Sequence, residues 1–128
     1  MTKNFTFITL LGILFSTGGC AGALLVGGGA GAGTAAYIMG ELKSTEEASI
    51  EKTWQAAQKA MDDLEFLVTS KQKDALSAKL IAREANDKKI EIKLKKISES
   101  LTEVKIRVGV FGDESLSLHV LKEIRKNL

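Results

Sequence analysis

Alternation of apolar and charged residues along positions 89–95 restricts this stretch to a β-strand with one buried face and one wet face. Ile90, Ile92 and Leu94 share one side, and the lysines and glutamate between them share the other, because successive strand side chains point to opposite faces of a sheet. Three further segments alternate in the same way: residues 66–70, 76–83 and 103–110. Short turn-rich connections separate the four segments, which predicts an antiparallel meander.

The last two segments predict their own register. The expected cross-strand pairs are Ile92–Ile106, Leu94–Val104, Glu91–Arg107, Lys95–Glu103 and Lys93–Lys105. Two of these pairs join opposite charges and each contributes ~0.2–1 kcal/mol, whereas Lys93 and Lys105 repel each other. We expect Val110 to continue the inward-facing row of the final strand.

Two amphipathic helices flank the strands. Ser49 is a favourable N-cap, and an apolar stripe with helical spacing follows it, which predicts a helix over residues 49–64 with Trp54 in the middle of the stripe. Asp113 and Glu114 open a second helix that runs to the C-terminus. With a weak strand at 41–45, the prediction for residues 41–128 is an α+β domain of βαββββα order. Two helices cover one face of an antiparallel four- to five-stranded sheet.

The first forty residues differ sharply from this domain, since they hold ten of the twelve glycines and only one charged residue, Lys3. Residues 1–19 show the order of a secretory signal peptide: a positive start, an apolar run from Phe5 to Phe15, then small residues. As a helix this run rises only about 16 Å, roughly half of the hydrocarbon core of a bilayer.

The stretch Thr17-Gly18-Gly19-Cys20 resembles the lipobox of bacterial lipoproteins, in which the cysteine thiol receives a diacylglycerol and the cysteine becomes the new N-terminus. We therefore expect a lipid anchor at Cys20. The alternative is an ordinary buried cysteine. Ala21 follows instead of the aspartate that retains lipoproteins in the inner membrane, so the resemblance implies a periplasmic protein and favours the outer membrane.

Residues 21–40 carry seven glycines and no charge. With Cys20 they read as a glycine-rich tether, a composition typical of flexible linkers. Small residues spaced four apart, such as Gly27 and Gly31, leave a membrane-associated or membrane-spanning helix open as an alternative. A nucleotide-binding loop is excluded, because the GxGxxA pattern at 31–36 lies in no βαβ unit.

Two segments, Gly40-Glu41-Leu42-Lys43 and Arg107-Val108-Gly109-Val110-Phe111-Gly112-Asp113, are similar to a family of short bacterial lipoproteins catalogued as a domain of unknown function. The resemblance runs from Cys20 to the C-terminus, and the RVG-x-FGD block is its most specific part. It implies an envelope location and this fold, and it implies no activity or site residues.

The chain offers little that points to catalysis. One Cys and one His cannot form a Cys/His zinc site, and the near-neutral net charge gives no basis for nucleic-acid binding. His119 is expected to be solvated and Trp54 to pack in the core. The carboxylates are scattered among lysines. We therefore expect a non-catalytic binding or structural protein without a cofactor, and an envelope hydrolase with an unrecognised site is the alternative.

One surface stands out, the outward face of the predicted sheet. Seven basic residues there oppose Glu91 and Glu103: Lys79, Arg83, Lys89, Lys93, Lys95, Lys105 and Arg107. Such a face either keeps the sheet soluble and unaggregated or contacts anionic lipid headgroups, lipopolysaccharide phosphates or an acidic envelope protein. Lys93 and Lys105 are the expected contact residues, because the register leaves them without a facing carboxylate.

Overall fold

The computed structural model describes residues 35–128. The predicted signal peptide, Cys20 and residues 21–34 lie outside the described residues. The elements are β1 (Ala35–Ile38), β2 (Glu41–Glu46), α1 (Ile50–Asp63), β3 (Leu67–Lys73), β4 (Ser77–Arg83), β5 (Lys89–Ser98), β6 (Leu101–Val108) and α2 (Glu114–Lys126).

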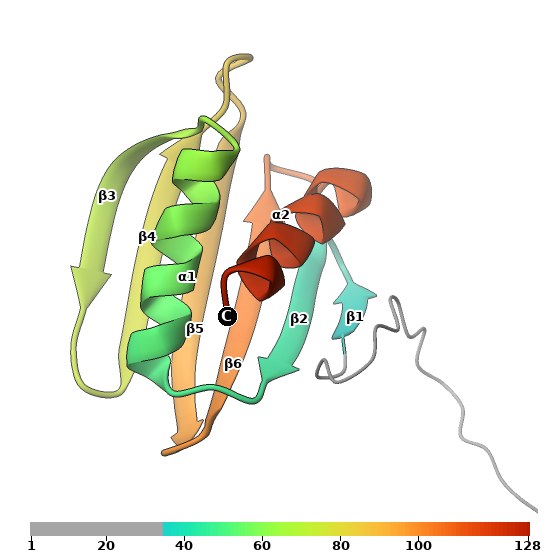
Figure 1. Ribbon diagram of the computed structural model, residues 1–128. Coiled ribbons are helices and arrows are strands. Elements are labelled where there is room, and N and C mark those ends of the chain that lie inside the picture. Colours follow the sequence, from blue (N-terminus) through green and yellow to red (C-terminus); the bar gives the residue numbers. More distant parts are fainter. Residues whose placement is uncertain (1–34) are drawn as a thin grey trace, which may run out of the picture.

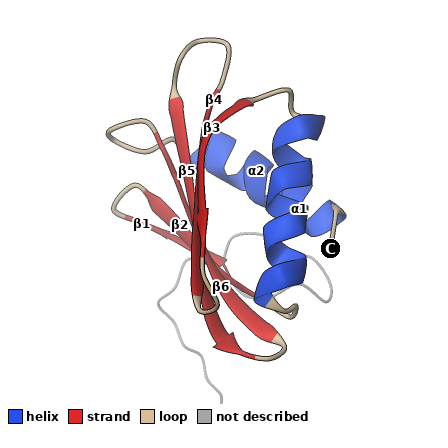
Figure 2. Ribbon diagram, turned by 90° about the vertical axis from the view of Figure 1, so that its left-hand side faces the viewer, coloured by secondary structure: helices blue, strands red, loops and turns tan. Residues whose placement is uncertain are grey.

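The strands form one antiparallel sheet in the order β1-β2-β6-β5-β4-β3 (Figure 1). Both helices lie on the same side of the sheet, and no helix or strand of residues 35–128 covers the opposite face, which we call the uncovered face (Figure 2). The predicted α+β class and the two-helix layer are confirmed.

The predicted strand number of four to five is wrong, because the sheet has six strands. The additional strand, β1, comes from residues 35–38, which the sequence analysis placed in the tether. Met39 and Gly40 have φ angles of 52° and 84°, and a two-residue hairpin turn with two positive φ values connects twisted antiparallel strands well. With four residues, β1 is too short for an alternating pattern of apolar and polar residues to be recognised in the sequence. A membrane helix over 21–40 therefore cannot include residues 35–40.

The core lies between the two helices and the face of the sheet that they cover. It contains the apolar residues that the alternating pattern predicted to be buried. Ile90, Ile92 and Leu94 are at most 2% exposed. The predicted register is also confirmed: Glu91 lies opposite Arg107, and Lys93 lies opposite Lys105. Apolar and polar residues alternate along these strands because only one face of the sheet is packed, and this alternation makes the strands predictable from the sequence.

The alternation fails at the strand ends. Val110 is 81% exposed, so its predicted burial is wrong. Strand β6 stops at Val108, and Gly109 then takes a φ of 72°, which turns the chain out of the sheet. Leu76 is likewise exposed and lies before β4, because the Asp74 carboxylate accepts hydrogen bonds from the backbone N–H groups of Leu76 and Ser77 in a turn.

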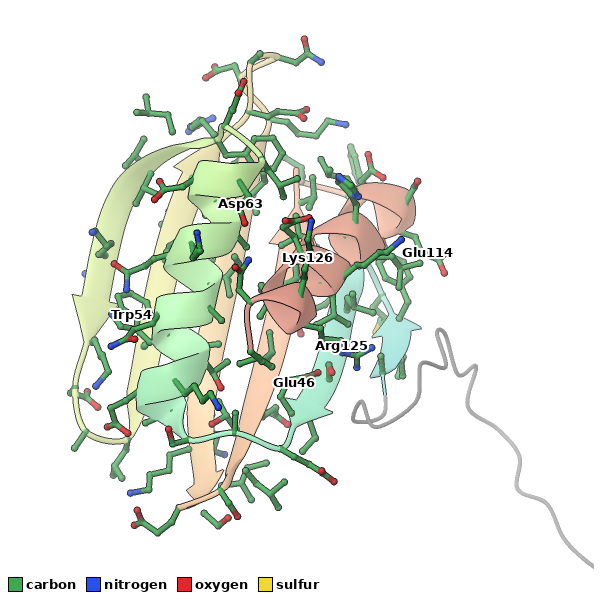
Figure 3. The ribbon with its side chains drawn as sticks, viewed as in Figure 1. Glu46, Trp54, Asp63, Glu114, Arg125 and Lys126 are labelled. Carbon is green, nitrogen blue, oxygen red and sulfur yellow. The ribbon has the colours of Figure 1, made fainter. Side chains whose placement is uncertain are left out.

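Helix α1 begins as predicted. The Ser49 hydroxyl accepts a hydrogen bond from the backbone N–H of Lys52 at 3.1 Å. The fully buried stripe is rotated from the predicted one and runs along Ile50, Thr53, Ala57 and Met61. Trp54 is therefore only partly buried and packs against the edge of the core, on the side of α1 nearer β3 (Figure 3).

A partly buried ion pair connects α2 to β2. The Glu46 carboxylate is 2% exposed and accepts hydrogen bonds of 3.0–3.1 Å from the Arg125 guanidinium, and both side chains also bond the Ser44 hydroxyl (Figure 3). A bidentate pair of this kind satisfies the charge of the buried Glu46 carboxylate, while the Arg125 side chain stays 20% exposed. It holds α2 over β2 and β6.

We expect Trp54→Ala to lower the free energy of unfolding by about 2 kcal/mol, less than the ~3–5 kcal/mol typical of a fully buried aromatic side chain. Met61→Ala, at a fully buried position on the same helix, should cost more, about 3 kcal/mol. Urea unfolding of residues 35–128 measures both values. A larger loss for Trp54→Ala than for Met61→Ala contradicts this packing.

Candidate functional site

The uncovered face of the sheet is strongly basic. Its outward-facing residues include three carboxylates, Glu41, Glu91 and Glu103, and eight basic side chains: Lys43, Lys79, Arg83, Lys89, Lys93, Lys95, Lys105 and Arg107. We call this surface the basic face, and its net charge is +5. The described residues carry 17 basic and 16 acidic side chains, so the remaining nine basic and thirteen acidic residues give the rest of the domain a net charge of −4.

Four lysines of the basic face form a single row across the sheet. Lys43, Lys105, Lys93 and Lys79 lie directly opposite one another on β2, β6, β5 and β4. At about 4.8 Å between neighbouring strands, this lysine row spans about 14 Å. Lys79, Lys93 and Lys105 belong to the outward face predicted from the sequence, and β2 adds Lys43, which that prediction did not include.

Two carboxylates of the basic face, Glu91 and Glu103, form ion pairs with lysines, and not with the predicted partners Arg107 and Lys95. Glu91 binds Lys79 at 3.1 Å, and Glu103 lies 3.7 Å from Lys43 and 3.8 Å from Lys105. The expectation that Lys105 has no carboxylate partner is therefore wrong, because Glu103 lies two residues away on the same face of β6. Lys93 forms no ion pair with any described residue and is exposed.

The lysines also influence the acidity of Glu91. Partial burial alone would raise the pKa of Glu91, but the hydrogen bond and charge of Lys79, together with the charges of Lys93 and Lys89, lower it. Glu91 is thus held ionised on this face. Its negative charge is satisfied by Lys79, which leaves the middle of the lysine row positive.

A shallow hollow of about 510 Å³ lies beside the lysine row, between β3, β4, β5 and β6. Its lining contains lysines with Asp74 and Glu103, and it contains neither His nor Cys. In the described part of the chain, no group of His, Cys, Asp or Glu side chains is placed to hold a metal ion. His119 is exposed on α2, as predicted. The lysines in its lining make the hollow suited to an anion.

Two neighbouring turns form a second feature, which the sequence pattern does not predict. The β1–β2 turn and the loop after β6 carry four exposed apolar side chains: Ile38, Met39, Val110 and Phe111, which are 62–91% exposed. We call these four residues the apolar tip. Val110 was predicted to be buried and Phe111 was not singled out, because no sequence pattern reports which way a turn projects.

Arg107 and two glycines hold the turns together. The Arg107 guanidinium donates hydrogen bonds to the carbonyl oxygens of Met39 at 3.0 Å and Val110 at 3.2 Å. A Cβ on Gly112 would lie 2.5 Å from the Cα of Gly40, so the two backbones touch where only glycine fits. The GELK and RVG-x-FGD segments, far apart in sequence, thus form one contact.

Asp113 continues this contact into α2. Its carboxylate accepts a hydrogen bond from the backbone N–H of Leu116 and pairs with Lys88 at 3.1 Å. The N–H of Leu116, and then Lys88, lower the pKa of Asp113. The aspartate that ends the block therefore caps the helix, as the sequence predicted.

We expect Gly112→Ala to prevent folding or to cost several kcal/mol, because its Cβ would overlap Gly40 and its φ is 91°. Gly109→Ala is the matched control. It also has a positive φ, but its Cβ meets only the Lys88 side chain at 3.6 Å, so the loss should be about 1–2 kcal/mol. Urea unfolding compares the two. Equal losses would show that strain in φ, rather than the glycine contact, is the constraint.

Neither helix of the described residues is long and apolar enough to cross a membrane. The comparison with curated proteins found no match. A family model described as "Protein of unknown function (DUF3568)" matches residues 4–127. This match spans nearly the whole chain, including the basic face, the apolar tip and both motif segments. The chain therefore belongs to the DUF3568 family of proteins of unknown function.

Proposed function

We propose that this protein is a bacterial envelope lipoprotein, anchored by lipid at Cys20, whose folded domain is a non-catalytic binding module. The anchor rests on the sequence: a signal-like segment ends at the lone cysteine, and Ala21 follows it. Two or more acyl chains hold a protein stably on a membrane, since each buried CH₂ contributes ~0.8 kcal/mol. The domain then faces the periplasm, with the outer membrane as the favoured site.

The observation that carries the binding role is the lysine row on an uncovered face. Lysines scattered among glutamates would keep a sheet soluble without mutual repulsion. Here like charges lie directly opposite one another on four strands, which is destabilising, and among the described residues Glu91 and Glu103 offset only part of this repulsion. A surface that accepts this cost is suited to a ligand with several negative charges, such as phosphates of lipid or lipopolysaccharide, or an acidic protein.

The anchor is tested by Cys20→Ala. We expect this change to abolish incorporation of a fatty-acid analogue in growing cells and to leave a precursor of higher apparent mass, because the thioether cannot form. The wild-type chain, labelled in parallel, is the reference. Equal labelling of the two proteins contradicts the anchor and leaves Cys20 an ordinary cysteine.

The basic face is tested by Lys93→Gln with Lys105→Gln in residues 35–128, once urea unfolding shows that this fragment folds. At about 1 kcal/mol per charge, the double variant should bind anionic vesicles roughly 10- to 30-fold more weakly, with a smaller loss at high salt. Lys52→Gln with Lys122→Gln changes the net charge equally on the helix layer and should bind like the wild type. Co-sedimentation at two ionic strengths gives the values.

Two outcomes of that experiment contradict the proposal in different ways. If both double variants lose binding equally, net charge alone is responsible and the lysine row has no special role. If the wild-type fragment binds neither anionic nor neutral vesicles, the basic face does not recognise lipid. A solvated face or an acidic protein partner then explains the lysines.

A further inference from the structure

The apolar tip projects from the same side of the sheet as the basic face. Ile38 lies opposite Glu41 on the outward side of β1, in the outward row that continues through Arg107. The β1–β2 turn and the loop from β6 to α2 both extend away from the helices (Figure 2). A second hollow, of about 690 Å³, lies between this loop and the sheet. Its lining combines Val110 and Phe111 with four basic side chains and with the carboxylates of Asp87 and Glu91.

The exposure of the apolar tip is built into the backbone. Met39 takes a φ of 52°, which is uncommon for a residue other than glycine, asparagine or aspartate. The Arg107 hydrogen bonds and the Gly40–Gly112 contact fix both turns, so the side chains cannot simply fold back onto the core. A cluster of large apolar side chains held outward on a soluble domain marks an interaction site.

We propose that the apolar tip inserts into the surface of an anionic membrane while the basic face contacts its headgroups; this proposal rests on, and extends, the proposed binding role of the basic face. The apolar tip consists of four exposed apolar side chains that project from two neighbouring turns. They match the shallow apolar layer beneath lipid headgroups, where such groups are buried about 5–10 Å deep. The flanking lysines and arginines are placed for the lipid phosphates.

The chain outside the described residues is compatible with this arrangement. Cys20 precedes Ala35 by fifteen positions, and fifteen residues span at most about 50 Å. The lipid at Cys20 and the apolar tip can therefore reach the same bilayer. Docking at a second point would fix the orientation of the domain and hold the basic face against the membrane.

The test uses the full chain bound to vesicles. Its single tryptophan, Trp54, is replaced, and a tryptophan is introduced at another position to report on the local environment. In a Trp54→Phe background, Phe111→Trp places the indole at the apolar tip, and Leu76→Trp places it at the other end of the sheet. Both positions are exposed, at 91% and 66%. The vesicles contain phosphatidylglycerol and phosphatidylcholine brominated on its acyl chains, which quench only tryptophans that enter the bilayer.

We expect Phe111→Trp to be quenched at least about twofold more than Leu76→Trp, and its emission to shift to shorter wavelength, because only the tip enters the acyl boundary. Urea unfolding of each variant verifies that it is folded. Equal quenching of the two variants, or quenching of neither, overturns the proposal.

The result separates this proposal from the function on which it rests. Salt-sensitive binding of residues 35–128 to anionic vesicles, without quenching of Phe111→Trp, would leave the basic face as a headgroup-binding surface and refute insertion of the tip. Strong quenching that is equal in vesicles without phosphatidylglycerol would establish insertion and refute a role for the basic residues.

Discussion

Two helices cover only one face of this six-stranded sheet, and the other properties of the domain follow from that constraint. The covered face supplies the core, because Ile92, Leu94, Ile106 and their neighbours lose contact with water against α1 and α2. The uncovered face has to remain compatible with water, so it carries lysines, arginines and a few glutamates. A small domain with one packed layer thus acquires a broad charged surface as a direct result of its architecture.

Solubility explains why the uncovered face is charged but not how its charges are arranged. Glu91 and Glu103 neutralise the two ends of the lysine row, whereas Lys93 in the middle has no acidic partner among the described residues. At one end of the sheet, the Arg107 guanidinium donates hydrogen bonds to two carbonyl oxygens in the turns and thereby connects the basic face to the apolar tip. Charge and apolar side chains are therefore presented together, in one direction and on a fixed backbone.

Where a segment with alternating or helically spaced apolar residues was long, the sequence alone was enough to predict its secondary structure. Strands β5 and β6, their register and the cap at Ser49 follow from local patterns that the packed face enforces. The short β1 strand escaped prediction because its pairing depends on a turn at Met39 and Gly40 rather than on a pattern. The apolar tip was not predicted for a related reason. It depends on the contact between Gly40 and Gly112, which is a tertiary contact between segments far apart in the sequence.

Hydrogen exchange of the full chain in anionic vesicles, compared with neutral vesicles, tests the central claim that the uncovered face and the apolar tip lie against the membrane. Turn amides are informative because they lack the strong protection of the sheet ladder. The account predicts slower exchange in anionic vesicles at residues 38–41 and 109–112, with no change in α1 or α2. Added protection confined to the helices, or the same exchange in both kinds of vesicle, would contradict it.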